Sequence, residues 1–218
     1  MELLIEYYKS DNAARNQEYI FCIEKNLKNK FIDKVHVFID DINTELEINS
    51  DKLNVIRIEK RNTYSDFFNY ANFNLQGKKV ILANTDIFFD ETLEFVENFT
   101  FNEVVLSLTR WDYNMNTKNS ELYYVDMSQD CWMFQTPMNV NGADFLLGKP
   151  GCDNRISFLF HEAGLDVRNP AMQIKTHHVH DSKYRTYTTA DTVAGWYMTL
   201  LPNNNINSQT YKRIIESF

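Results

Sequence analysis

One stretch decides the fold of this chain: Lys79-Val80-Ile81-Leu82-Ala83-Asn84-Thr85-Asp86-Ile87-Phe88-Phe89-Asp90. Its apolar run Val80–Ala83 is rich in β-forming residues and too short for a helix, so it predicts a buried strand. Open α/β sheets bind their ligands just beyond the carboxyl ends of such strands, where Asp86 would lie. A divalent cation that bridges phosphates needs one or two carboxylates of this kind. Asp86 is therefore a candidate metal ligand; the alternative is a residue that starts a turn or caps the next helix.

The composition describes a chain that can build a substantial hydrophobic core. Of the 218 residues 44% are hydrophobic, and only 6 Gly and 4 Pro are present, which argues against a disordered or repetitive chain. The net charge of -8 argues against a nucleic-acid-binding protein, because neutralising phosphates requires a basic surface. A nucleotide ligand is compatible with this acidity, since a metal ion can supply positive charge locally.

Targeting signals and cysteine usage predict a cytoplasmic protein. We find neither an apolar run long enough to span a membrane nor the charged start and apolar segment of a signal peptide. The three cysteines, Cys22, Cys131 and Cys152, are scattered, odd in number and without zinc-site spacing. This usage fits a reducing compartment.

Strands and helices alternate along the first half of the chain, which predicts an α/β fold with a mostly parallel sheet and helices on both faces. The second half is less regular, but no linker or repeat divides it, so we expect a single domain over residues 1–218. The expected strands are 2–8, 35–39, 53–58, 80–83, 103–108, 122–127, 131–135 and 173–180, and the expected helices are 14–29, 64–75, 153–164 and 211–218.

Three of the five histidines lie within Ile174-Lys175-Thr176-His177-His178-Val179-His180. In a strand, His178 and His180 face one way and His177 the other. Two imidazoles on one face can supply a metal ligand and a hydrogen bond to phosphate. Chance clustering of idle surface histidines is the alternative.

A glycine-rich approach, Gly148-Lys149-Pro150-Gly151, leads into a helix that starts with Asp153-Asn154-Arg155. Asp153 suits the N-cap of that helix, which needs no catalytic explanation. An acid at such a place can also act as a general base. The local pattern alone favours the cap.

Two further segments, Arg110-Trp111-Asp112 and Asp130-Cys131-Trp132, each set an acid beside a tryptophan. Tryptophan faces stack on sugar rings and carboxylates accept hydrogen bonds from hydroxyls, although both tryptophans could equally be core residues. Arginine forks suit diphosphate oxygens. The candidates for substrate contact are Arg110, Trp111, Asp112 and Trp132, and those for the diphosphate are Arg61, Arg155, Arg168 and Arg185, of which Arg168 is the weakest.

Taken together, a strand ending in Asn84-Thr85-Asp86, a Gly-rich loop into Asp153 and a late histidine cluster resemble the GT-A glycosyltransferases. In particular, the chain resembles the small single-domain enzymes of chlorella-type viruses and some bacteria, over roughly residues 3–187. Members of this family hold Mn²⁺ or Mg²⁺ on a nucleotide-sugar diphosphate with an Asp-x-Asp motif. The resemblance implies that Asp86 binds the metal, with Asp90 as a weaker alternative, and that Asn84 contacts the ribose or the sugar.

The same resemblance implies roles for the remaining candidates. Asp153 matches the acid that deprotonates the acceptor hydroxyl in inverting members, with Asp130 as its rival. His178 matches the late metal-binding histidine best, and His180 second. The residues near the nucleotide base and the phosphates would be Arg61, Tyr64, Arg155 and His180, and those of a C-terminal segment over the diphosphate would be Arg185 and Tyr187.

The implied activity is transfer of a sugar from a UDP-, GDP- or dTDP-sugar to a hydroxyl of a glycan or another acceptor, in the cytoplasm (the host cytoplasm for a viral protein). Two other functions remain open. A nucleotide-sugar-binding module without catalysis would keep the same site. A sugar-phosphate nucleotidyltransferase would need a Gly-rich N-terminal phosphate loop, which residues 7–12 do not form.

Overall fold

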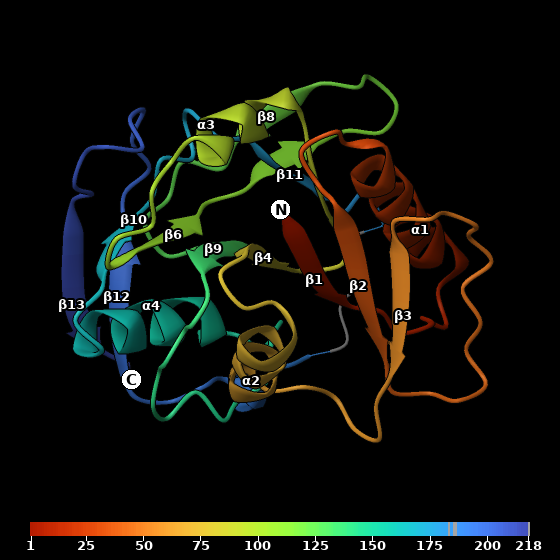
Figure 1. The fold of residues 1–218 in the computed structure, drawn as a ribbon, viewed down its shortest axis with the longest axis horizontal. Coiled ribbons are helices and arrows are strands. Elements are labelled where there is room, and N and C mark those ends of the chain that lie inside the picture. The colour runs from red at the N-terminus through yellow and green to blue at the C-terminus, as the bar shows by residue number, and fades with distance from the viewer. Residues whose placement is uncertain (183, 185–186, 218) are drawn as a thin grey trace.

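In the residues that it describes, 1–182, 184 and 187–217, the computed structural model has a central sheet of seven strands (Figure 1). The strand order is β10-β6-β9-β4-β1-β2-β3. β9 is antiparallel to both of its neighbours and every other adjacent pair is parallel, so the predicted mostly parallel α/β sheet is confirmed. The strands are β1 (Glu2–Glu6), β2 (Lys34–Ile39), β3 (Leu53–Arg57), β4 (Lys79–Ala83), β6 (Val104–Leu108), β9 (Cys131–Gln135) and β10 (Asp166–Arg168).

Each face of this sheet has its own hydrophobic core. Side chains alternate along a strand, so Leu3 and Ile5 of β1 pack into one core and Leu4 into the other. The first core takes in α1 (Ala13–Lys28) and α3 (Glu94–Glu97), and the second takes in α2 (Tyr64–Asn74) and α4 (Cys152–Glu162). Figure 1 shows α2 and α4 below the sheet and α3 above it. Helices on both faces are therefore confirmed.

A second sheet brings the histidine strand beside the exit of β4. Its order is β5-β11-β7-β8, with β5 (Ile87–Phe89), β7 (Trp111–Tyr113), β8 (Ser120–Leu122) and β11 (Thr176–Val179). The register pairs His178 with Ile87 on one side and with Asp112 on the other. Because Ile87 directly follows Asp86, this pairing places the histidine strand next to the candidate metal ligand.

Two predicted elements in the second half are wrong. The segment expected as a closing helix is instead β13 (Lys212–Glu216), which pairs antiparallel with β12 (Trp196–Leu200). An isolated helix of eight residues is only marginally stable. Pairing with β12 instead gives the backbone N–H and C=O groups of this segment their hydrogen-bond partners. The strand expected at 122–127 ends at Leu122. Two short 3-10 helices, η1 (Glu91–Leu93) and η2 (Thr189–Asp191), complete the secondary structure of the described residues.

None of the helices in the described part of the chain has the length and apolar character that crossing a bilayer requires.

Candidate functional site

A cavity of about 710 Å³ lies where β1 and β4 end and where the loop before α4 approaches them. This volume is within the range of roughly 300–1,000 Å³ that is usual for small-molecule sites. Most of the residues predicted from the sequence meet here. Those that line the cavity are Arg61, Asn84, Asp86, Arg110, Asp130, Trp132, Asp153, His178, His180 and Tyr187.

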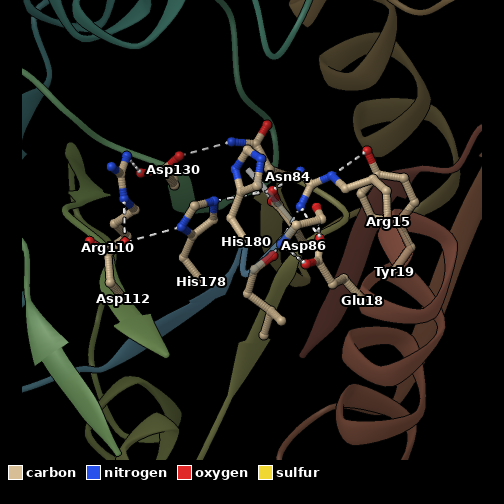
Figure 2. Close-up of polar contacts among 12 residues, drawn as sticks. Arg15, Glu18, Tyr19, Asn84, Asp86, Arg110, Asp112, Asp130, His178 and His180 are labelled. Carbon is tan, nitrogen blue, oxygen red and sulfur yellow. Dashed lines mark hydrogen bonds and ion pairs between the residues drawn. The ribbon is translucent and has the colours of Figure 1, made fainter. Parts of the chain in front are cut away.

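Asp86, His178 and His180 form a group that could hold a metal ion, with potential ligand atoms all within 4.8 Å of one another (Figure 2). The Nε2 atom of His178 lies 3.1 Å from Oδ2 of Asp86. The other carboxylate oxygen, Oδ1, is buried and has no hydrogen-bond partner among the described residues. A buried oxygen without a partner costs free energy unless something binds it, so the donor set fits a cation.

His178 is oriented by a second carboxylate. Its Nδ1 donates to Oδ1 of Asp112 at 3.1 Å, which leaves Nε2 pointing toward Asp86. Metal-binding histidines are commonly held in this way by a carboxylate behind them. Burial opposes protonation of His178, but Asp86 and Asp112 raise its pKa to about 9, so a cation and a proton compete for Nε2.

His180 differs from His178 in its protonation. Its Nε2 donates to the carbonyl oxygen of Tyr184 at 2.9 Å. Burial, together with the positive charges of Arg15 and His178, lowers its pKa below the ordinary value. At neutral pH His180 is therefore uncharged, which is the form that binds cations.

Sequence reasoning missed Arg15, the buried cation of this site. From α1 its guanidinium donates to Oδ2 of Asp86, to Glu18 at 2.7 Å and to the oxygen of Tyr19 at 3.0 Å. Burial disfavours ionisation of Asp86, but His178 and Arg15 outweigh it and hold the pKa of Asp86 well below its usual range. The only signal was local: Arg15, Glu18 and Tyr19 form a polar stripe at helical spacing on an otherwise apolar face.

Asp153 lies in the first turn of α4, behind a tight backbone turn at Gly151. Gly151 has a φ of 75°, and a Cβ there would lie 2.1 Å from the hydroxyl oxygen of Tyr197, so only glycine fits. The N-cap of α4 is Gly151, and the predicted cap role of Asp153 is wrong. Its Oδ2 accepts a hydrogen bond from the backbone N–H of Gln129 at 3.1 Å instead.

Asp153 has the protonation behaviour of a general base. Burial, opposed by backbone hydrogen bonds such as that from Gln129 and assisted by the nearby carboxylate of Asp130, raises its pKa to about 7. A carboxyl group that titrates near neutral pH can accept and return a proton efficiently.

Asp130 is connected to the cation group through one arginine. Its Oδ1 accepts from Nδ2 of Asn84 at 3.1 Å, and its Oδ2 lies 3.4 Å from Nη1 of Arg110. The Nε of Arg110 donates to Asp112 at 2.8 Å. Asp112 in turn holds His178, so a chain of alternating charges runs from Asp130 to Arg15 across the site (Figure 2).

Two aromatic candidates are core residues. Tyr64 and Trp132 are both 0% exposed and meet edge to face, with ring centroids 5.1 Å apart. Complete burial argues against the expected contacts of Tyr64 with a nucleotide and of Trp132 with a sugar, although Trp132 forms part of the cavity wall. Trp111 does not line the cavity, and its indole N–H donates to the carbonyl oxygen of Ala171 at 2.7 Å.

The arginine candidates separate in the structure. Arg61 lines the cavity and is held by two hydrogen bonds, of 3.0 and 2.9 Å, to Oε2 of Glu6. Arg155 does not line the cavity and donates to the carbonyl oxygen of Trp196 at 3.2 Å. The predicted phosphate ligand Arg185 lies outside the described residues.

The register of the histidine strand agrees with the sequence prediction. His177 points to the opposite face, where its Nε2 lies 2.9 Å from Asp90 and its ring stacks on Phe88 with centroids 4.6 Å apart. Asp90, the weaker alternative metal ligand, therefore pairs with His177 on the opposite face of the strand and lies apart from Asp86, His178 and His180.

The sequence matches no protein family model and no curated protein. Among solved structures, S. aureus TarS 1-349 matches with a TM-score of 0.46 and 14% identity, over 82% of this chain and 57% of that one. HddC from Yersinia pseudotuberculosis matches with a TM-score of 0.37 and 9% identity, over 62% of this chain and 76% of that one. A second TarS structure matches with a TM-score of 0.38 and 20% identity, over 52% of this chain and 22% of that one.

This chain resembles parts of the TarS and HddC structures only loosely, because all three TM-scores lie below 0.5. It spans little more than half of the first TarS structure. Similarity at this level supports no conclusion about the fold family or the chemistry of this chain.

Proposed function

We propose that this chain is a metal-dependent glycosyltransferase that moves a sugar from a nucleotide-diphosphate sugar to an acceptor hydroxyl. One observation carries the proposal: a single cavity joins a candidate cation group, Asp86 with His178 and His180, to a carboxyl group of pKa about 7, Asp153. Glycosyl transfer needs both, because charge develops on the leaving diphosphate while the acceptor hydroxyl loses its proton.

The cation would be held by Oδ1 of Asp86 and by the imidazoles of His178 and His180. The unpartnered Oδ1 and the orientation of His178 by Asp112 support this ligand set. Of the two expected ions, Mn²⁺ suits the imidazoles better, since Mg²⁺ prefers oxygen ligands and retains its waters. When bound, the ion acts as a Lewis acid that neutralises the diphosphate.

Asp153 is the better candidate for the general base than Asp130. Both oxygens of Asp130 are engaged, one by Asn84 and the other by Arg110 and Ser128. The carboxylate of Asp153 is held by backbone N–H groups, among them that of Gln129, and its pKa of about 7 suits a group that takes up the proton of an acceptor hydroxyl. With Asp153 on the acceptor side, we propose a single displacement that inverts the anomeric carbon.

Arg61 is the candidate for the donor phosphates. Its side chain is 37% exposed at the cavity, and Glu6 fixes its position from behind. A guanidinium held in this way donates to phosphate oxygens in a defined geometry. Asn84 lies between the cation group and Asp130, where it would contact the ribose or the sugar of the donor.

The test is turnover of UDP-, GDP- and dTDP-sugars with Mn²⁺ against a panel of glycan acceptors. Thermal shift first selects the donor, because a ligand at a hundred times its Kd adds about 2.7 kcal/mol of stability. We expect Mn²⁺-dependent release of nucleoside diphosphate together with a glycosylated product. Donor binding without any turnover or hydrolysis would favour a binding module, and pyrophosphate release from a sugar phosphate and a nucleoside triphosphate would favour a nucleotidyltransferase.

A further inference from the structure

The segment between β8 and β9 presents large apolar side chains at the surface. Tyr123 is 41% exposed, Tyr124 60% and Met127 48%. Of these, Tyr123 and Met127 line the cavity and Tyr124 does not. One aromatic ring of this exposed pair is therefore turned toward the site and its neighbour away from it.

This segment is fixed at both of its ends. The backbone N–H of Tyr123 donates to the carbonyl oxygen of Arg110 at 3.1 Å. Asp126 is held from the β12–β13 ribbon, where its carbonyl oxygen accepts from the N–H of Leu200 at 2.8 Å and its carboxylate accepts from Thr199 and Arg213. A side chain on such an anchored segment loses little freedom when it binds a ligand.

The ring of Tyr123 has one covered face. The guanidinium of Arg110 lies over it, 4.2 Å from the ring centroid. Two fifths of the residue remains exposed, and Tyr123 lines the cavity, so part of its surface is accessible to a ligand there. Arg110 is itself tied to Asp112 and Asp130, so the ring is backed by the same charged chain that crosses the site.

Acceptors of hydroxyl hydrogen bonds follow directly along the chain. The segment continues through Ser128, Gln129 and Asp130, all of which line the cavity. The backbone N–H of Gln129 holds Asp153, the candidate base. An open aromatic face beside carboxylate and hydroxyl oxygens is the combination that recognises a sugar ring, because the C–H groups of a pyranose pack on the ring while its hydroxyls bond to oxygen.

We propose that Tyr123 is the platform on which a pyranose ring of the acceptor stacks, and that the acceptor is consequently a glycan. The inference rests on the proposed function, since it names the acceptor class of the same site. Stacking on Tyr123 would place the acceptor along the wall that carries Asp153 and leave the cation group to the donor.

The experiment measures direct binding with saturation-transfer NMR. The probes are methyl pyranosides of glucose, galactose, mannose and N-acetylglucosamine, with ribitol as an open-chain polyol. We expect saturation of the ring C–H protons of at least one pyranoside. Its binding should weaken about 2- to 12-fold in Tyr123→Ala, the usual contribution of an aromatic contact, and persist in Tyr123→Phe. Tyr124→Ala is the matched control and should bind as the wild type does.

Loss of the ring could also act through Arg110, so Mn²⁺ affinity is measured in the same variants by electron paramagnetic resonance. Weaker pyranoside binding with unchanged Mn²⁺ affinity supports the proposal, and a parallel loss of both overturns it. It is also overturned by equal pyranoside binding in wild type and Tyr123→Ala, by the absence of pyranoside binding, or by a preference for ribitol. Mn²⁺-dependent nucleotide binding is scored separately, and its absence would contradict the proposed function whatever Tyr123 does.

Discussion

The two oxygens of Asp86 have different surroundings, and that difference gives the residue two tasks. Oδ2 neutralises Arg15 and His178 inside the protein, whereas Oδ1 has no partner among the described residues. We expect Asp86→Asn to weaken Mn²⁺ binding by more than about 100-fold, because the loss of a mere outer partner of a ligand already costs about 10–100-fold. Titration of Mn²⁺ by electron paramagnetic resonance measures this.

Asp90→Asn is the control for that variant. Asp90 is also an acid near the histidine strand, but it pairs with His177 on the other face. Mn²⁺ affinity should remain within a few-fold of the wild-type value. A larger loss of Mn²⁺ affinity in Asp90→Asn than in Asp86→Asn would indicate that the cation binds on the His177 face of β11 and not on the His178 face.

Arg15 is a buried charge, so its removal should lower the free energy of unfolding. Arg15→Met leaves Asp86 paired with His178 and removes the cation beside the buried Glu18, and breaking a buried pair typically costs about 3–5 kcal/mol. We expect a loss within that range, because His178 continues to compensate Asp86 while Glu18 loses its cation. Lys28→Met on the same helix is the control: Lys28 forms only an exposed pair with Glu24 and should change the free energy of unfolding by less than about 0.5 kcal/mol. Urea denaturation compares the two variants.

Asp153 should control the pH dependence of both activity and stability. Transfer needs the carboxylate, so kcat/KM should rise with pH through about 7 and then level off. Stability runs the other way: a raised carboxyl pKa means that the native state holds its proton more tightly than the unfolded chain, so stability falls as pH rises from about 4 to about 7. Asp153→Asn should flatten that part of the stability profile.

In the same variant, turnover should decrease about 10²- to 10⁴-fold, the usual contribution of a general base. Donor affinity should be unchanged, which separates a lost base from a damaged site. Near-normal turnover in Asp153→Asn would transfer the role to Asp130.

At the scale of elements, β11 separates two histidine environments by its alternation. His178 faces Asp86, while His177 stacks on Phe88 and pairs with Asp90. We therefore expect His178→Ala to abolish Mn²⁺ binding, and His177→Ala to retain it but melt at a lower temperature. Calorimetry with and without Mn²⁺ reports both. The reverse pattern would mean that the register of β11 is off by one residue.

Local pattern predicted the elements that stand on their own. Val80–Ala83 was predicted as a strand because its residues are apolar and β-forming, and these residues belong to β4 in the structure. The C-terminal segment was misread because its state depends on β12, a partner that no local pattern reveals. The opposite orientations of His178 and His177 were also predicted, because side chains alternate between the two faces of any strand.

Tertiary partners explain the site residues that sequence reasoning placed wrongly or missed. Trp132 read as a sugar platform, but its strand lies between two others and its ring is covered by Tyr64. Arg15 contacts Asp86 from 71 residues away, so no spacing rule could connect them. Asp153 was underrated because its local setting resembles a cap, and only burial beside Asp130 raises its pKa.

At the scale of the whole molecule, the site exists only when distant segments are assembled on one sheet edge. Arg15 comes from α1, Asp86 from the exit of β4, Asp130 from the start of β9 and His178 from β11. The antiparallel direction of β9 is essential, because it brings the beginning of that strand to the edge where β4 ends. The backbone N–H of Asn84 accordingly donates to the carbonyl oxygen of Asp130 at 3.3 Å.

The position of β9 has a consequence for synthesis on the ribosome. β9 is made after both β4 and β6, yet it lies between them. A nascent chain released only as far as Asp130 therefore leaves β4 without one of its partner strands and β6 without both, and unpaired strand edges are templates for association with other chains. The emergence of β9 joins β4 to β6 and sets Asp130 beside Asn84 in the same event, whereas the cation group is completed only when His178 and His180 follow.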